Sequence, residues 1–331
     1  MRREKSIIMI AYLKKHDAEL GENTKIKVLK SIQNNDLKIN CLNDSSINLS
    51  LKGKLNFWLY LADGNVPEEY GMLLEEMYRN VISKSSDPEK VDCINDPKLK
   101  LNSYMKTELI KLLEDDSLKI GYLTDPRIEL DPCCKVEIIS SIKDNQLKVG
   151  CLTNPDIELD LADKVNIIDS IKDDRVKVEC LTNLDIGLDS DDKAKIILSL
   201  EDDTLKVNCL TDPNIGLDFS DKSEAATSLL QIVLSIKDDQ IKLDCLTNPN
   251  IELETHEKAL TIVSLKDNDL KMDCLVNSEL GLDPTGKAMV VSSLEDDQIK
   301  LNYMQDPNME FNDKDKLLII CSLIELNAKK C

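Results

Sequence analysis

The chain repeats itself with a period of 29 residues, and this repetition limits the folds that it can adopt. Segment 202–218, DDTLKVNCLTDPNIGLD, has close copies that begin at Asp115, Asp144, Asp173, Asp238, Asp267 and Asp296. One position of the copies, here called the cysteine ladder, holds Cys93, Tyr122, Cys151, Cys180, Cys209, Cys245, Cys274 and Tyr303. An earlier copy carries Cys41. Repeats of this length are typical of solenoids, in which each repeat buries its apolar face only against its neighbours.

A second series of equivalent positions fixes the register of the repeats. It consists of Lys25, Lys54, Lys106, Lys135, Lys164, Lys193, Lys222, Lys258, Lys287 and Lys316. Both series advance in steps of 29 residues, with steps of 52 and 36 at the same two places, which indicates insertions of 23 and 7 residues. We therefore expect a capping half-repeat over 1–24, a repeat array over 25–311 and a capping helix over 312–331, with about nine repeats in all.

Each repeat has the pattern of two helices. In the first helix, which begins at Ser190, the apolar residues Ile196, Ile197 and Leu200 share one face. The second helix begins at the pair Asp202–Asp203, because carboxylates suit a helix N-terminus, and Pro213 ends it. The sequence therefore predicts an all-α fold, an α-solenoid of helix pairs.

A lysine lies inside the apolar arc of every second helix. The series is Lys38, Lys90, Lys119, Lys148, Lys177, Lys206, Lys242, Lys271 and Lys300. A lysine on an apolar face extends its amine towards water or pairs with an acid. We expect a series of ion pairs with the aspartates that open the second helices, rather than catalytic lysines.

One alternative fold follows from the same residues. Leu205, Val207 and Cys209 alternate with period two, as in a short strand. A strand and a helix in about 29 residues would make a leucine-rich-repeat-like α/β solenoid. However, the Thr-Asp-Pro or Thr-Asn-Pro that follows differs from the leucine-rich-repeat pattern, which favours the helix pair.

The motif Asp-Asp-x-Leu-Lys-Val-x-Cys-Leu after Ile-Ile-x-Ser-Leu resembles the short HEAT-like repeat of about thirty residues. Asp202, Leu205, Lys206 and Cys209 stand where that family has its opening aspartate, its aliphatic–basic pair and a small residue. The resemblance extends from Lys25 to Leu323 and implies an architecture rather than an activity. A proline after six of the second helices departs from the family pattern and predicts that these helices are shortened: Pro97, Pro126, Pro155, Pro213, Pro249 and Pro307.

The two insertions predict local departures from the stack. The first, near 62–86, predicts a helix over 68–82, and Phe57, Trp58, Tyr60, Tyr70 and Tyr78 lie in or beside it. Phe57 and Trp58 occupy core positions of the preceding helix, whereas Tyr70 and Tyr78 either anchor a partner or fill the core. The second insertion, within 223–229, extends a first helix by two turns and nearly preserves its apolar face.

Composition excludes several classes of partner. The net charge is −20, and nucleic acids and anionic membranes both attract positive charge, so we expect neither as a partner. No apolar stretch has the length of a membrane span, so we expect no membrane insertion. Seven of the eleven cysteines occupy one repeat position, which indicates small buried residues in a reducing compartment. We therefore expect a cytoplasmic protein, or one in a host cytosol if the source is an intracellular pathogen or a virus.

Motifs of known catalytic sites are not present in the sequence. It contains no Gly-rich phosphate loop, no GxSxG and no HExxH, and its two histidines are far apart. We therefore expect no enzymatic activity, no catalytic residue, no cofactor and no metal site. The alternative is a regulatory subunit, or an enzyme with a HEAT-like fold whose site has no recognisable motif.

A binding surface is predicted on the second helices. The position between Val207 and Cys209 should point outward, and its equivalents, here called the acidic stripe, are Asn40, Asp92, Gly121, Gly150, Glu179, Asn208, Asp244, Asp273 and Asn302. The predicted function is a scaffold or adaptor that binds a protein with a basic surface. The candidate partner-binding residues are Asp92, Gly121, Gly150, Glu179, Asp244 and Asp273, together with Tyr70 and Tyr78.

Overall fold

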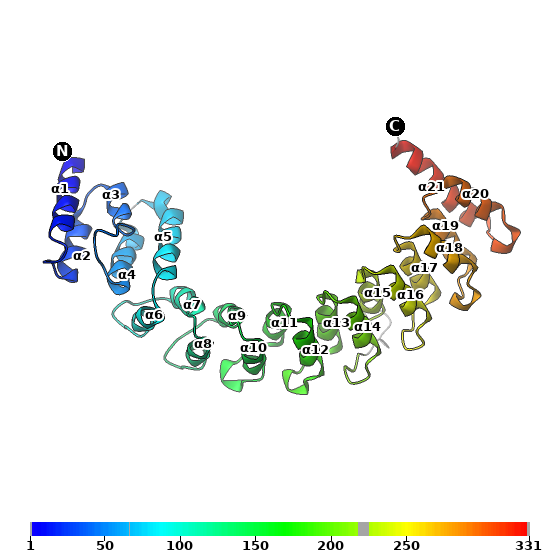
Figure 1. Cartoon of the computed structure of the whole chain (residues 1–331), viewed down its shortest axis with the longest axis horizontal. Coiled ribbons are helices and arrows are strands. Elements are labelled where there is room, and N and C mark those ends of the chain that lie inside the picture. Colours follow the sequence, from blue (N-terminus) through cyan, green and yellow to red (C-terminus); the bar gives the residue numbers. More distant parts are fainter. Residues whose placement is uncertain (1, 66, 218–224, 330–331) are drawn as a thin grey trace. The chain divides into compact units, whose positions relative to one another are not determined.

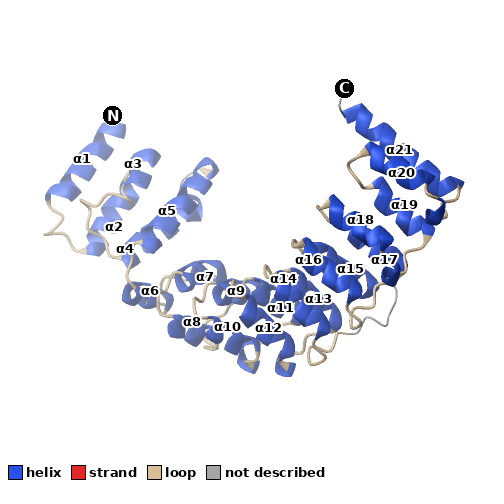
Figure 2. Ribbon diagram, turned by 45° about the vertical axis from the view of Figure 1, so that its right-hand side comes forward, coloured by secondary structure: helices blue, strands red, loops and turns tan. Residues whose placement is uncertain are grey.

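The computed structural model describes residues 2–65, 67–217 and 225–329, and the regular elements in these ranges are helices (Figure 2). They pack in the order in which they occur in the chain, which confirms the predicted all-α solenoid. No strand occurs in these ranges, so the leucine-rich-repeat-like alternative is wrong. Leu205, Val207 and Cys209 lie in helix α14 (Asp203–Thr211), because the capping aspartate before them starts a helix.

The chain divides into two compact halves, residues 1–163 and residues 164–331, and the boundary falls inside α11 (Leu161–Asp169). The N-terminal half contains α1 (Arg2–Lys15), α2 (Glu22–Ser31), α3 (Asn35–Asn40), α4 (Leu51–Tyr60), η1 (Leu61–Asn65), η2 (Glu68–Tyr70), α5 (Gly71–Ser83), α6 (Asp87–Ile94), α7 (Ser103–Lys111), α8 (Asp116–Leu123), α9 (Pro132–Ser140), α10 (Asn145–Leu152) and η3 (Pro155–Ile157) (Figure 1).

The C-terminal half continues the same alternation of first and second helices (Figure 1). Its elements after α11 are α12 (Asp174–Thr182), η4 (Leu184–Ile186), α13 (Ser190–Leu198), α14 (Asp203–Thr211), α15 (Ala225–Ser235), α16 (Asp239–Thr247), α17 (Thr255–Val263), α18 (Asn268–Val276), η5 (Ser278–Leu280), α19 (Pro284–Ser292), α20 (Asp297–Gln305), η6 (Pro307–Met309) and α21 (Asp313–Lys329).

First helices pack on first helices within each half, as α13 does on α15 and α17 on α19. Second helices pack on second helices, as α12 does on α14 and α14 on α16. Ile196, Ile197 and Leu200 are buried between the two layers, as predicted. The cysteines predicted to be buried free thiols are confirmed: Cys151, Cys180, Cys209, Cys245 and Cys274.

The two aspartates that open a second helix have different tasks. Asp202 caps its own helix, because its Oδ1 accepts from the backbone N–H groups of Thr204 and Leu205 at 2.8 and 3.1 Å. Asp203 reaches the next repeat, where its Oδ2 accepts from the N–H groups of Lys237 and Asp238 at 2.7 and 3.0 Å. The second aspartate therefore joins neighbouring repeats through the backbone.

The second-helix lysines are buried, and their main partners differ from the prediction. Lys119 Nζ donates to the carbonyl oxygen of Ser141 at 2.9 Å, at the end of the next first helix, and also pairs with Asp116 at 3.0 Å. Lys242 Nζ donates in the same way to Ser264. The expected series of ion pairs is thus incomplete, because the last carbonyl groups of a helix lack internal partners and attract a cation.

The second helices that precede a proline end shortly before it, as predicted. Helix α14 ends at Thr211, two residues before Pro213, and the Oδ1 of Asp212 accepts from Asn214 N at 2.9 Å to form the turn. Gly216 follows with φ of +64°, a left-handed conformation that glycine adopts without strain. These helices are short, at eight or nine residues in α8, α10, α12 and α14.

The first insertion adds one helix, α5, preceded by a short turn of helix at Glu68–Tyr70. The predicted helix therefore exists but begins at Gly71 rather than at residue 68. The second insertion was predicted within 223–229; residues 218–224 lie outside the described residues, and α15 is described from Ala225 onward. At the two ends, α1 and α21 occupy the places of the predicted capping segments.

Candidate binding surfaces

The acidic stripe lies on the exposed side of the second helices in the C-terminal half. Its members there are exposed: Glu179, Asn208, Asp244, Asp273 and Asn302. On α12, α14, α16 and α18 the stripe position directly precedes a buried cysteine of the ladder and lies two residues after a buried lysine. These buried side chains anchor each helix in the core and leave the stripe position on its outer side. Because α14 packs against both α12 and α16, three stripe positions belong to neighbouring helices.

The charge of the stripe is felt by the buried thiols behind it. Burial, together with the nearby Asp244 carboxylate, raises the pKa of Cys245 to about 11. Asp244 also accepts from Gln240 Nε2 of its own helix at 3.3 Å. The stripe carboxyl groups thus lie close to the helix surface, which makes this face able to attract positive charge.

The stripe in the N-terminal half is flatter. Asn40 and Asp92 are exposed on α3 and α6, and glycines occupy the position on α8 and α10. A Cβ added at Gly121 or Gly150 would meet no atom within 4 Å, so the surface above these glycines is open. The sequence therefore predicted correctly that all six charged or glycine candidates of the stripe are exposed; their part in binding stays a prediction.

Tyr78 is not available to a partner, which corrects the prediction that it anchors one. Its side chain is 1% exposed, and its hydroxyl donates to the carbonyl oxygen of Met105 at 2.9 Å. Burial raises the pKa of this phenol, which stays a neutral donor. The helix period places Tyr78 on the inner face of α5, and only the packing of α5 against the α4–α7 region makes that face the buried one.

Tyr70 is half-buried, and its hydroxyl donates to Asp36 Oδ1 at 2.8 Å, a hydrogen bond that raises the pKa of the phenol. Its proposed part as a partner anchor stays a prediction. Phe57 is fully buried, as predicted for a core position. Trp58 is half-buried and donates its Nε1–H to the carbonyl oxygen of Leu74 at 2.7 Å.

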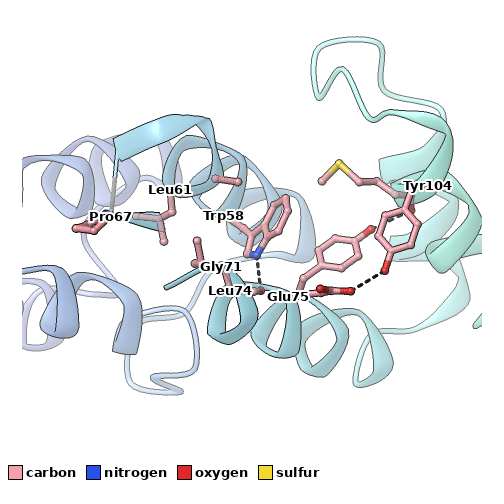
Figure 3. Close-up of a pocket in the computed structure, with 10 residues that line it drawn as sticks. Trp58, Leu61, Pro67, Gly71, Leu74, Glu75 and Tyr104 are labelled. Atoms are coloured by element: carbon pink, nitrogen blue, oxygen red, sulfur yellow. Dashed lines mark hydrogen bonds between the residues drawn. The ribbon is translucent and has the colours of Figure 1, made fainter. Parts of the chain in front are cut away.

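A cavity opens beside Trp58, and we call it the Trp58 pocket (Figure 3). It has a volume of about 420 Å³, and its walls include Trp58, Leu61, Gly71, Leu74, Tyr104 and Met105, from α4, η1, α5 and α7. This volume lies in the range of pockets that hold small ligands, about 300–1,000 Å³. The lining is mainly apolar, and the indole ring contacts that of Tyr78, with centroids 4.9 Å apart.

One charged side chain lies in the wall of this pocket. Glu75 Oε1 accepts from the hydroxyl of Tyr104 at 3.0 Å and from Arg79 Nη2 at 2.9 Å (Figure 3). Tyr104 in turn accepts from Arg79 Nη2 at 3.2 Å, which is the main reason that the pKa of the guanidinium is raised. The three groups satisfy one another, so this side of the pocket is locally neutral.

The pocket was not predicted from the sequence, since its walls come from segments that only folding brings together. One feature beside it can be read from the sequence, the tyrosine at a repeat position, and the exposures are seen only in the structure. Tyr104 stands where the following repeats have Cys133, Ala162 and Asp191, and it is 41% exposed. Met72, next to the pocket wall, is 87% exposed. Large exposed apolar side chains beside a cavity are typical of interaction sites.

Two further observations concern metal binding and membrane insertion. Within residues 2–65, 67–217 and 225–329, no three His, Cys, Asp or Glu side chains are grouped so as to hold a metal ion. In the same ranges, no helix combines the length and the apolar character that crossing a membrane requires. Comparisons with protein-family models, with curated proteins and with solved structures find no match to this chain.

Proposed function

We propose that this chain is a protein-binding scaffold, and that a partner with a basic surface docks on the acidic stripe. The observation that carries the proposal is the uniform exposure of one position per second helix, two residues after a buried lysine and directly before the ladder position. Glu179, Asp244 and Asp273 place three negative charges along the stripe in the C-terminal half, with the uncharged Asn208 between the first two. Such a row favours an extended basic partner, because electrostatic complementarity selects partners and speeds encounter.

The proposal includes the class of repeat and the compartment. Helix pairs of 29 residues, with an aspartate that opens the second helix, support a place among the HEAT-like short repeats. The reduced, buried cysteine ladder supports a cytoplasmic location, since a reducing compartment keeps such thiols free. The negative net charge supports a protein partner rather than a nucleic acid.

The test begins with the proteins that co-purify with the full chain from its native cell. The most abundant partner is then measured against a stripe variant in which Glu179, Asp244 and Asp273 are changed to Lys. We expect binding to weaken about tenfold or more, because each exposed charge pair contributes about 0.2–1 kcal/mol and reversal turns attraction into repulsion.

A matched variant separates the surface from the net charge. Asp185, Glu252 and Glu279 are exposed and lie in the turns between helices, away from the stripe position. Changing these three to Lys brings the net charge from −20 to −14, as the stripe variant does, since each reversal adds two. Equal binding by the two variants would remove the stripe as the docking surface.

A further inference from the structure

The Trp58 pocket adjoins a second cavity, and the two share Trp58, Ala62, Tyr104 and Met105 as walls. The second cavity, which we call the lysine groove, has a volume of about 630 Å³. Its charged lining consists of three basic residues, Lys30, Lys98 and Lys100, and one acidic residue, Asp63. An apolar pocket thus opens next to a groove whose lining carries a net positive charge.

The positive lining of the lysine groove contrasts with the negative net charge of the chain. The protein has 62 acidic and 42 basic residues, so a surface depression lined by more bases than acids departs from the average. Lys98 and Lys100 are exposed and belong to the loop between α6 and α7. Lys30, from α2, donates to Asn56 Oδ1 at 3.2 Å, and its Nζ lies 5.0 Å from the centre of the Tyr60 ring, so these two contacts hold its amine at the groove.

The acid in the Trp58 pocket does not cancel this field. Glu75 is already paired with Arg79 and bound by the Tyr104 hydroxyl, and it lines the pocket rather than the groove. The two cavities therefore differ in what they recognise. The pocket offers apolar walls and an aromatic ring, whereas the groove offers ammonium groups that attract a carboxylate.

We infer that the Trp58 pocket and the lysine groove together bind a peptide segment with a large apolar side chain next to a carboxylate. The apolar side chain enters the pocket against Trp58, and the carboxylate lies in the groove near Lys98 and Lys100. Aromatic walls and nearby exposed apolar groups are what interface anchors contact. This inference rests on the proposed function, because the ligand is a segment of a protein, but it uses residues outside the acidic stripe.

We assign the carboxylate to an Asp or Glu side chain within the partner segment, and the C-terminal end of a partner chain is the alternative outcome. Both present the same group to the groove, and they are separated by experiment. The probes are four acetylated peptides: Gly-Phe-Glu-Gly-amide, Gly-Phe-Lys-Gly-amide, Gly-Ala-Glu-Gly-amide, and Gly-Gly-Phe with a free C-terminal carboxylate.

Trp58 provides the signal, because it is the only tryptophan in the sequence and lines both cavities. Each peptide is titrated into the full chain up to millimolar concentration while tryptophan emission is recorded. We expect a saturable change with the Phe-Glu peptide, about tenfold weaker binding of the Phe-Lys peptide, and no change with the Ala-Glu peptide. Tighter binding of the free carboxylate peptide would assign the groove to a chain end.

Two variants test each half of the site. Gly71→Leu adds a side chain at the pocket wall, where an added Cβ meets no atom within 4 Å, so we expect the fold to tolerate it and the leucine to narrow the pocket. Gly21→Leu is the matched control, since its Cβ is equally unobstructed and Gly21 lines neither cavity. We expect Gly71→Leu to abolish the emission change and Gly21→Leu to retain it. Changing Lys98 and Lys100 together to Gln should remove the preference for Glu over Lys.

The proposal is overturned if no peptide changes the emission, if Gly71→Leu binds like the native chain, or if the Phe-Lys peptide binds as tightly as the Phe-Glu peptide. These outcomes differ from failure of the proposed function. A partner whose binding depends on the acidic stripe would leave the scaffold function standing even if every peptide failed. Conversely, peptide binding without any effect of the stripe variant would leave the pocket as the docking site.

Discussion

Lysine is costly to bury, yet the second-helix lysines are all buried, from Lys38 to Lys300. Their position was predictable, because each lies inside an apolar arc of the sequence. Their principal partner was not, since a backbone carbonyl such as that of Ser141 leaves no trace in the sequence. Burial lowers the pKa of Lys206 and Lys242. The carboxylates of Asp203 and Asp239 oppose this shift, and both amines donate to the ends of the neighbouring first helices.

The first prediction concerns one of these lysines. Lys119→Met should lower the free energy of unfolding by about 3 kcal/mol, because it leaves the Ser141 carbonyl and the Asp116 carboxylate without their ammonium partner. Urea denaturation followed by circular dichroism measures the change. Lys143→Met, at an exposed position, is the control and should shift stability by less than about 0.5 kcal/mol. Equal effects of the two substitutions would show that the buried contacts contribute nothing.

The second prediction concerns the cysteine ladder. Cys209→Ala should cost about 1–2 kcal/mol of stability, through lost apolar area and a small void. In the native protein Cys209 should also react slowly with a thiol reagent, because it is buried and burial raises its pKa to about 12. Exposed Cys133 and Cys321 should react faster. Mass spectrometry of the labelled peptides tests this, and rapid labelling of the whole ladder would contradict it.

At the scale of the element, the helix pair follows from the sequence because local signals determine it. The aspartate caps, the 3.6-residue apolar period and the prolines fix where α13 and α14 begin and end, to within about two residues. The contacts between elements are less accessible. The second aspartate of each pair, such as Asp203, resembles a helix-start residue in the sequence, although it binds the next repeat. The Trp58 pocket, likewise, depends on how the inserted α5 packs.

The third prediction tests the junction between repeats. Asp116 accepts from Lys143 N and Asp144 N and pairs with Lys119. Burial acts to raise its pKa, but these hydrogen bonds prevail and the pKa is lowered. A carboxyl whose pKa is lower in the folded state stabilises the fold above its unfolded pKa, and this stability is lost as pH falls through the folded value. Acidification below about pH 4 should therefore weaken the junction.

Asp116→Asn is the variant that isolates this effect. It should be less stable than the native chain at pH 7, and the difference should shrink as the pH falls below the unfolded pKa of about 4 and then through the lower pKa of the folded state. Urea midpoints measured across this range give the comparison. Asp115→Asn serves as the control, because Asn also caps helices and Asp115 makes its side-chain hydrogen bond within its own helix. A difference that is constant with pH would contradict the assignment.

At the scale of the whole molecule, the same packing arrangement recurs in one repeat after another. One buried face per repeat builds the stack, and one exposed position per repeat remains free to vary between Asn, Asp, Glu and Gly. A solenoid could therefore be predicted from the period, and its helix pairs from the residues within each repeat, whereas the partner could not, because the exposed positions carry no structural constraint. The net charge of −20 acts on any partner at a distance, before contact is made.

The last prediction separates the long-range effect of the net charge from the local effect of the charges in the acidic stripe. If a basic partner docks on the acidic stripe, added salt should slow association more than it speeds dissociation, because salt screens charges over about 10 Å at 0.1 M. Stopped-flow or surface-based kinetics would be measured for the native chain, for the stripe variant and for the turn variant. The turn variant is the matched variant in which Asp185, Glu252 and Glu279 are changed to Lys, and its net charge equals that of the stripe variant. The stripe variant, with Glu179, Asp244 and Asp273 reversed, should associate most slowly and show the flattest dependence on salt. The turn variant should retain most of the native rate, because the charges next to the docking surface contribute most to steering. If the two variants slow association equally, only the net charge matters and the stripe is not the surface that the partner meets.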